Sequence, residues 1–447
     1  MLAAPALAGR RFLVLGLART GLATLRFLAR SGAEALAWDA RAEARAAAAA
    51  EFPGLAFCDP ETAPLDGLDG LLLSPGVPLN RHPAARRARA AGVPVLGDME
   101  LFQRARPGLP AHRVVGITGT NGKSTVTALV HHLLASAGRT ARMGGNIGEP
   151  VLDQPALLEG GVYVLEISSF QIDLCQTLAC DVAVWTNLAA DHLDRYESIA
   201  AYAAAKERLF AMQPAGAHAV IATDDPWTRA AFARLPASTV RHRVSGADIR
   251  PEDQARWPGL PGPHNAQNAA CAIAVARILG LAEAEIEAGL ASFRPLAHRM
   301  ETVATVAGVR YVNDSKATNP ASAAPALASF SGIHWIAGGE AKTAELDCCL
   351  PHLLRVRAAY LVGSAAGLFE SILAPRGVPT VMAGTVARAV ALAAAAARPG
   401  ETVLLSPACA SFDQFADYAA RGEAFRQAVL GLAPARGAPA GASAESC

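Results

Sequence analysis

Short apolar runs alternate along most of the chain with longer alanine-rich segments that have the spacing of amphipathic helices. Segments such as 22–30 and 124–137 are predicted to be helices. This alternation is typical of βα units, so the sequence predicts an α/β fold around mostly parallel sheets. The runs predicted to be strands are residues 12–17, 35–38, 71–73, 93–96, 113–118, 162–167, 182–186, 219–222, 309–312, 335–337, 360–362 and 402–405.

The length and the breaks in this pattern predict three domains. A chain of 447 residues is too long for one core, since a domain usually holds about 150 residues. Residues 104–112, which contain two prolines and a glycine, are predicted to be a linker, and a third series of strands begins near residue 301. The predicted domains are 1–107 (Rossmann-like), 108–300 (a P-loop ATPase-like, mostly parallel sheet) and 301–447 (Rossmann-like), with 433–447 expected to be a disordered tail.

Charge and composition exclude several classes of protein. The 40 basic and 39 acidic residues leave a net charge of +1, which provides no general field to hold a nucleic acid. The hydrophobic content of 52% comes largely from alanine, and arginines interrupt the apolar runs, so we expect no membrane insertion. No secretory signal is expected, and eight scattered cysteines without a CxxC pair suggest reduced thiols. We therefore expect a cytoplasmic protein. Any phosphate would be bound by a few neighbouring residues and not by the overall charge of the protein.

The strongest candidate for chemistry is a glycine-rich stretch between the predicted strand 113–118 and the predicted helix 124–137. It reads Gly116-Ile-Thr-Gly-Thr-Asn-Gly-Lys-Ser-Thr125. In such a loop, backbone N–H groups and a helix N-terminus bind phosphate, a lysine neutralises the β and γ oxygens, and a hydroxyl ligates Mg²⁺. A strict Walker pattern would have glycine at Ile117, so this loop is a variant of the consensus.

A second glycine-rich turn lies in the first predicted domain. Gly16 to Gly21 follows a strand and opens a helix, with Asp39 about 20 residues further on, as in a dinucleotide-binding fingerprint. Ala18 replaces the middle glycine, which disfavours close approach to a pyrophosphate. Ser74-Pro-Gly76 ends another strand at the edge where such sheets bind ligands. These residues leave a plain turn, another ligand and NAD all open.

Further polar residues follow the strands beside the phosphate loop. Glu166 ends a strand and is placed to coordinate Mg²⁺. The stretch 187–194 adds His192 and two carboxylates at the same edge, although a lone histidine is more often structural. Lys206 lies in a helical run and, taken alone, is interpreted as an ordinary surface lysine.

Several motifs occur together in the order of a known family. They are Gly119-Thr-Asn-Gly-Lys-Ser-Thr125, Gly144-Gly-Asn-Ile-Gly148, Glu166-Ile-Ser-Ser-Phe-Gln171, Asp191-His-Leu-Asp-Arg195, Asn313-Asp-Ser-Lys-Ala-Thr-Asn319 and Ser406-Pro-Ala-Cys-Ala-Ser411. From about residue 9 to about 432, the chain resembles the bacterial Mur ligases. The resemblance implies three domains, for a UDP-sugar, ATP and an amino acid, and an ATP-dependent amide ligase acting through an acyl phosphate in peptidoglycan precursor synthesis. The third and last motifs favour members that add D-glutamate to UDP-N-acetylmuramoyl-L-alanine.

The resemblance also implies roles for individual residues. The ATP site would comprise Gly119, Thr120, Asn121, Gly122, Lys123, Ser124, Thr125, Asn268 at the adenine, and Arg299 and Asp314 at phosphate and ribose. The UDP-substrate site would comprise Thr20, Asp39, Arg41, Gly76 and Asn146, and the D-glutamate site Lys316, Thr318, Lys342, Ser411 and Tyr418. Mg²⁺ ligands would be Ser124, Glu166, His192 and Lys206, which matches a family lysine carbamylated by CO₂; Lys123, Asn146, His192 and Lys206 would be catalytic.

Three alternatives remain beside this interpretation. The chain could be a sibling ligase, either another peptidoglycan amino-acid ligase or a folylpolyglutamate synthase. It could be a nucleotide-dependent switch, although a switch has no need of Lys316, Lys342 and Ser411 at one pocket. An NAD-linked oxidoreductase is disfavoured by Ala18. Arg19 and Tyr418 depart from the residues of a related enzyme, and we expect the protein to be a monomer.

Overall fold

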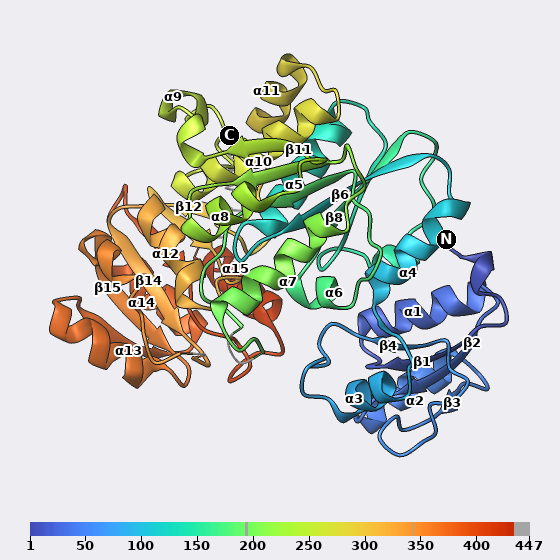
Figure 1. Cartoon of the computed structure of the whole chain (residues 1–447). Coiled ribbons are helices and arrows are strands. Elements are labelled where there is room, and N and C mark those ends of the chain that lie inside the picture. The colour runs from blue at the N-terminus through green and yellow to red at the C-terminus, as the bar shows by residue number, and fades with distance from the viewer. Residues whose placement is uncertain (193–194, 342, 433–447) are drawn as a thin grey trace, which may run out of the picture. The chain divides into compact units, whose positions relative to one another are not determined.

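A computed structural model describes residues 1–192, 195–341 and 343–432 (Figure 1). The chain forms two compact units. Unit 1 comprises the described residues of 1–260 and 264–293, and unit 2 comprises residues 261–263 and the described residues from 294 onward. Among the described residues, no helix is both long and apolar enough to cross a membrane.

The N-terminal region of unit 1 is a parallel sheet with a reversal in its strand order. The strands are β1 (Arg11–Leu15), β2 (Glu34–Trp38), β3 (Ala56–Phe57), β4 (Gly70–Leu73) and β5 (Val95–Leu96), in the order β3-β2-β1-β4-β5. They are connected by α1 (Arg19–Arg30), α2 (Ala42–Glu51) and α3 (Pro83–Ala90), and α4 (Asp98–Ala105) follows. The order reverses between β1 and β4, which opens a crevice at their carboxyl ends, as in the predicted Rossmann-like fold.

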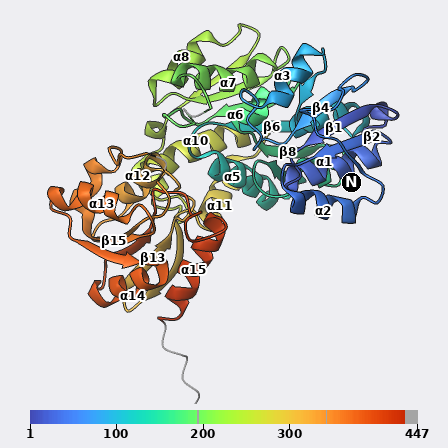
Figure 2. The same cartoon turned by 90° about the horizontal axis from the view of Figure 1, so that it is seen from below.

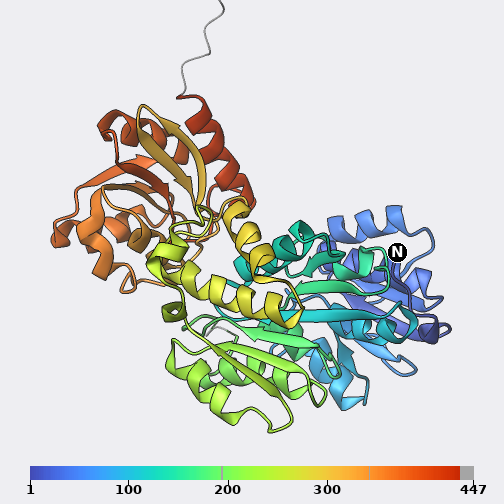
Figure 3. The same ribbon diagram turned by 90° about the horizontal axis from the view of Figure 1, so that it is seen from above.

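The central region of unit 1 is a second parallel sheet. Its strands are β6 (His112–Thr118), β7 (Ala141–Gly145), β8 (Gly161–Glu166), β9 (Val182–Trp185), β10 (His218–Ala222) and β11 (Val240–Val244), in the order β11-β10-β9-β6-β8-β7. One face packs on α6 (Ser169–Asp173), α7 (Ile199–Ala211) and α8 (Pro226–Arg234). On the other lie α5 (Lys123–Ser136), α10 (Pro263–Ile278) and α11 (Glu283–Ser292), as Figure 3 shows; α9 (Pro251–Gln254) precedes α10.

The two sheets of unit 1 share one hydrophobic core, which joins α1 and α4 to the central sheet. Residues 104–112, predicted to be a linker, contain the end of α4 and a 3₁₀ turn, Arg106–Gly108. Arg106 explains this difference, because its guanidinium donates to the carbonyl of Ala179 and, at 3.2 Å, to Asp181. The segment is therefore tied to the central region.

Unit 2 has one mixed sheet between two layers of helices (Figure 2). Its strands are β12 (Glu301–Val306), β13 (Val309–Asn313), β14 (Ile333–Gly338), β15 (Val356–Val362), β16 (Thr380–Gly384) and β17 (Thr402–Leu405), in the order β12-β13-β17-β14-β15-β16, with β12 antiparallel to β13. Trp335 faces α12 (Pro320–Ser329) and α13 (Ala366–Leu373), whereas Ile336 faces α14 (Val386–Ala396) and α15 (Tyr418–Leu430). The predicted α/β class is confirmed for all three sheets.

Candidate active site

The phosphate loop has the predicted order of strand, loop and helix, with β6 ending at Thr118 and α5 beginning at Lys123. Two of its glycines are required by close packing. Gly119 has φ +145°, and a Cβ there would lie 2.0 Å from Thr186 Oγ1. Gly122 has φ +81°, and a Cβ there would lie 2.2 Å from Asn268 Oδ1. The loop is thus shaped by the end of β9 on one side and by α10 on the other.

Asn187, just beyond the end of β9, holds this loop through three hydrogen bonds. Its Oδ1 accepts from the Asn121 N–H at 2.9 Å, its carbonyl accepts from the Thr120 N–H at 2.9 Å, and its Nδ2 donates to the Asn121 carbonyl at 3.1 Å. Sequence reasoning noted the stretch after β9 only for its histidine and carboxylates, and missed this role. The available signal was the position of Asn187 at the carboxyl edge that also carries the loop.

The hydroxyl and carboxylate predicted as metal ligands are in direct contact. Ser124 Oγ donates to Glu166 Oε2, and Asn146 Nδ2 donates to Glu166 Oε1 at 2.7 Å. Lys123, at the start of the same helix, donates from Nζ to the Gly119 carbonyl at 3.0 Å and the Thr120 carbonyl at 2.9 Å. One hydroxyl and one carboxylate beside a phosphate loop suit Mg²⁺, which is usually bound by one or two protein oxygens together with water and phosphate. The described residues contain no cluster of three or more histidine, cysteine or acidic ligands.

Lys206 and His192 both contact the ring of Tyr202. Lys206, on α7, is 1% exposed, donates from Nζ to the Gly119 carbonyl at 2.9 Å and lies 4.4 Å from the centroid of Tyr202. Burial lowers the pKa of Lys206 well below its usual value, and the charge of nearby Lys123 lowers it further. The interpretation of Lys206 as a surface lysine is therefore wrong. The His192 ring lies edge-on to Tyr202, with centroids 5.9 Å apart.

A cavity of about 380 Å³ lies between the N-terminal and central regions of unit 1. Its lining includes all five residues predicted for the UDP-substrate: Thr20, Asp39, Arg41, Gly76 and Asn146. Burial alone would raise the pKa of Asp39, but hydrogen bonds from the Arg41 side chain and from the Leu17 N–H outweigh it and lower this pKa to about 2. The cavity thus carries a permanent carboxylate beside a guanidinium.

Gln171 also lines this cavity and is held by a buried acid that the sequence did not reveal. Its Nε2 donates to Asp98 Oδ2 at 3.1 Å, and its Oε1 accepts from the Ser168 N–H at 3.1 Å. Burial raises the pKa of Asp98 to about 6, against the effect of the bond from Gln171. In the sequence, an acidic residue in the first turn of a helix is ordinary, so nothing distinguished Asp98.

In unit 2, four of the residues predicted for the amino acid follow β13 and β17 or begin α15. Lys316 Nζ lies 3.7 Å from the ring centroid of Tyr418, Thr318 follows two positions later, and Ser411 is 2% exposed. Lys342 and the predicted tail lie outside the described residues. The residues predicted for ATP are divided, because Asn268 belongs to unit 1 whereas Arg299 and Asp314 belong to unit 2.

Asp314 follows β13 and is deeply buried. Ser406 Oγ donates to its Oδ2 at 2.8 Å, and the Met300 N–H donates to its Oδ1 at 3.2 Å. Burial raises the pKa of Asp314 to about 7, although these hydrogen bonds oppose the shift. The carboxylate therefore links the start of unit 2 to the loop after β17.

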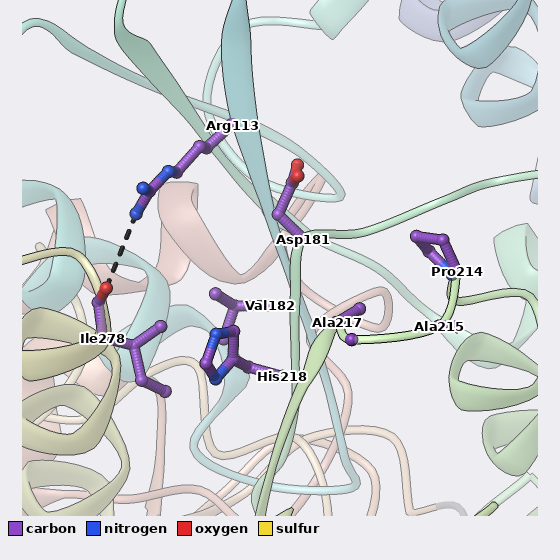
Figure 4. A pocket seen from close by; sticks show the side chains of 9 residues that line it. Arg113, Asp181, Val182, Pro214, Ala215, Ala217, His218 and Ile278 are labelled. Atoms are coloured by element: carbon purple, nitrogen blue, oxygen red, sulfur yellow. Dashed lines mark hydrogen bonds between the residues drawn. The ribbon is translucent and has the colours of Figure 1, made fainter. Parts of the chain in front are cut away.

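Another cavity of unit 1, of about 320 Å³, is shown in Figure 4. It lies at the amino ends of β6, β9 and β10, where Arg113 donates to the Ile278 carbonyl at 3.5 Å. None of the predicted site residues lines it. Since parallel α/β sheets bind ligands at the carboxyl ends of their strands, this cavity is not the candidate active site.

Comparisons with known proteins agree with this architecture. Models of three domains match in order: the Mur ligase MurD-like N-terminal domain at residues 10–97, the Mur ligase middle domain at 117–256, and the Mur ligase glutamate ligase domain at 298–409. The chain is similar to the UDP-N-acetylmuramoylalanine–D-glutamate ligases of Sphingopyxis alaskensis (57% identical, covering 97% of this chain and 100% of that protein) and Novosphingobium aromaticivorans (55% identical, 98% of each).

Solved structures share the fold at much lower identity. The UDP-N-acetylmuramate-alanine ligase of Thermotoga maritima has a TM-score of 0.58 at 17% identity and covers 94% of this chain and 99% of that one. MurF of Acinetobacter baumannii has a TM-score of 0.58 at 16% identity, with coverage of 90% and 89%. Taken with the near-full-length relatives, these matches show that the chain belongs to the Mur ligase family, in the branch of the UDP-N-acetylmuramoylalanine–D-glutamate ligases.

Proposed function

We propose that the protein joins D-glutamate to UDP-N-acetylmuramoyl-L-alanine, with ATP converted to ADP and phosphate, in peptidoglycan precursor synthesis. One observation carries this proposal: Asn146 lines the cavity of unit 1 and also donates to Glu166, the carboxylate that contacts Ser124 of the phosphate loop. A single side chain therefore connects the pocket for a substrate with the loop for a nucleotide. This connection supports a reaction in which a carboxylate held in that cavity approaches a phosphate held by that loop.

In the first step, the carboxylate of the substrate attacks the γ-phosphorus of ATP, which forms an acyl phosphate and releases ADP. Two anions must approach, so their charge has to be screened. Lys123 does this when its Nζ moves from the loop carbonyls to the phosphate oxygens. Mg²⁺, bound by Ser124 and Glu166, supplies further charge neutralisation when present.

In the second step, the amine of D-glutamate attacks the acyl carbon, and phosphate leaves as the amide forms. We assign D-glutamate to Lys316, Thr318, Lys342, Ser411 and Tyr418. Cations and hydroxyl donors suit its two carboxylates, because hydrogen bonds between charged groups are short and strong. Asn268, Arg299 and Asp314 are assigned to ATP, and His192 to the metal-binding edge.

We also assign a carbamate to Lys206, formed when its neutral amine attacks CO₂ and loses a proton. The burial of Lys206 against Gly119 and Tyr202 supports this assignment, because an unprotonated amine is the form that attacks. The carbamate anion could orient Mg²⁺, which an ammonium cannot.

The sequence makes this assignment easy to test, since lysine occurs only at positions 123, 206, 316 and 342. In ¹³C-bicarbonate, the NMR spectrum of the wild type should show a carbamate resonance that Lys206→Arg lacks and Lys316→Arg keeps. A resonance that survives Lys206→Arg would contradict the assignment.

The function is tested by phosphate release from ATP in the presence of UDP-N-acetylmuramoyl-L-alanine and a panel of D- and L-amino acids. Release should depend on D-glutamate. Preference for L-glutamate or meso-diaminopimelate would leave an amide ligase but move it to a sibling, whereas release independent of any amino acid would favour a nucleotide switch. We expect a cytoplasmic monomer, which sedimentation velocity can test.

A further inference from the structure

Unit 2 contains an arginine that is buried without forming an ion pair with any described carboxylate. Arg421, in the first turns of α15, is 1% exposed. Its acceptors are one hydroxyl and three backbone carbonyls. Nε donates to Ser315 Oγ at 3.0 Å, Nη1 to the Ala410 carbonyl at 3.0 Å, and Nη2 to the carbonyls of Ser315 at 2.8 Å and Cys409 at 3.0 Å.

Burying a cation in this way is unfavourable, and an apolar side chain of the same volume would fill the space at lower cost. Burial lowers the pKa of Arg421 to about 10, so the guanidinium is still charged at neutral pH. Its planar fork fixes the directions of several bonds at once, which neither an apolar residue nor a lysine can do. The arrangement therefore indicates that Arg421 fixes the relative positions of the groups it bonds to, and does not merely fill space in the core.

The segments bound by Arg421 adjoin residues assigned to the amino acid. Ser315 directly precedes Lys316, and its hydroxyl also donates to the Tyr418 carbonyl at 2.8 Å. Cys409 and Ala410 directly precede Ser411. These two segments lie far apart in the sequence, and Arg421 belongs to a third segment, 106 positions after Ser315 and 12 after Cys409.

The loop after β17 has a further sign of constraint. Ala408 has φ +59°, a left-handed conformation that is unfavourable for alanine and persists only where surrounding bonds hold it. The next two carbonyls are both acceptors of Arg421. The Ala410 carbonyl also accepts from the Glu340 N–H at 2.9 Å, so the loop after β14 is attached to the same point.

We propose that Arg421 is a positioning residue for the amino-acid site: it fixes the Lys316 segment and the Ser411 segment at the separation that the two carboxylates of the amino acid require. This inference rests on the proposed function. Arg421 itself does not touch the amino acid, because its donors face Ser315, Cys409 and Ala410. Its loss should therefore weaken amino-acid binding more than ATP binding, because the phosphate loop lies in unit 1 and Arg421 bonds to neither Arg299 nor Asp314, the residues of unit 2 assigned to ATP.

The test compares Arg421→Met and Arg421→Lys with Arg388→Met, which removes an exposed arginine from the same unit. Arg421→Met should raise the KM for D-glutamate about 10- to 100-fold, because several charge-assisted bonds are lost. Arg421→Lys should give a smaller rise. The KM values for ATP and for the UDP-substrate should stay within about twofold of wild type in both variants. Arg388→Met should change none of the three.

Ser315→Ala is the second variant, and it keeps the proposal testable if Arg421→Met does not fold. It removes the Nε acceptor and the bond to Tyr418 while the guanidinium stays, and it should raise the KM for D-glutamate several-fold. An unchanged KM for D-glutamate in both Ser315→Ala and Arg421→Lys, or an equal rise in all three KM values, would overturn the positioning role. If the wild type instead uses another amino acid, the proposed function is wrong. The positioning role of Arg421 is then tested by the KM for that amino acid in the same variants.

Discussion

The phosphate loop of unit 1 and the proposed amino-acid site of unit 2 are built in opposite ways. The loop is one uninterrupted stretch, residues 116–125, which contains the glycines and the helix N-terminus of a phosphate-binding motif, although Asn187 and α10 also contact it from outside. The residues proposed for the amino-acid site come from segments after β13 and β17 and from the start of α15, and Arg421 forms hydrogen bonds to the first two of these segments. Chemistry that depends on local backbone geometry can be recognised in a short motif, whereas chemistry assembled by tertiary contacts cannot.

Lysine usage shows that the two regions have something in common. The chain has lysine at positions 123, 206, 316 and 342 and uses arginine for all its other basic residues. Three of these lysines are described, and each lies at the phosphate loop or beside Tyr418. This usage fits the proposed roles, because a compact ammonium, or an amine that can lose its proton, differs in its chemistry from a planar guanidinium.

The largest effect is expected at the phosphate loop. Lys123→Ala should lower turnover by about 1000-fold or more, because no other residue of the loop brings a positive charge to the transferring phosphate. The midpoint of thermal unfolding should change little, since Lys123 bonds to loop carbonyls and belongs to no hydrophobic core. Turnover within tenfold of wild type in a folded variant would contradict the assignment of the ATP site.

The second largest loss of activity is expected at Lys206, a residue of α7 that contacts the phosphate loop. Lys206→Ala should be nearly inactive, and short carboxylic acids should restore part of the rate, because a small anion can occupy the place of a carbamate. The measurement is turnover against acetate concentration, with sodium chloride as the matched control for ionic strength. Full activity of Lys206→Ala without added acid would argue that the residue is only structural.

A smaller and more selective effect is expected in unit 2. Lys316→Ala should raise the KM for D-glutamate about 10- to 150-fold, because one charge-assisted contact typically contributes about 1.5–3 kcal/mol. The KM for ATP should stay near that of wild type, which separates this variant from Lys123→Ala. A weakened ATP site with an unchanged KM for D-glutamate would show that Lys316 acts with Arg299 and Asp314, the residues of unit 2 assigned to ATP, and not in the amino-acid pocket.

The contrast between local and assembled features also explains which parts of the structure could be predicted. The strands absent from the sequence prediction are β3, β7, β11, β12 and β16, and all of them lie at sheet edges. An edge strand has one paired neighbour and more contact with water, so its sequence is less apolar, as in the Val-Arg-His-Arg-Val of β11. Central strands, which are buried on both faces, were found within a few residues of their ends.

The candidate site residues also fall into two groups, those that could be predicted from local sequence and those that depend on tertiary contacts. Lys123, Ser124 and Glu166 could be proposed from their positions after β6 and β8. The burial of Lys206 could not, because it depends on α7 packing against the loop. The buried partners of site residues, Asp98 and Arg421, carry no motif at all. Their roles follow only from contacts between segments that are distant in sequence.

The smallest effect on activity is expected for Asp98, whose buried carboxyl holds Gln171 in unit 1. The pKa of Asp98 is about 6 in the folded protein, whereas the ordinary value for an aspartate is 3.8, so the folded state binds the proton more tightly than the unfolded state does. Wild type therefore loses stability as pH rises from about 4 through 6, and Asp98→Asn, which cannot ionise, does not. Relative to wild type, the variant should gain up to about 3 kcal/mol in the free energy of unfolding between pH 4 and pH 7.5, with turnover changed only a few-fold.

Urea denaturation at both pH values measures this difference, and Glu51→Gln, at an exposed ion pair, is the control. A stability difference that does not change with pH would mean that Asp98 stays ionised in the fold and that a charged carboxylate holds Gln171.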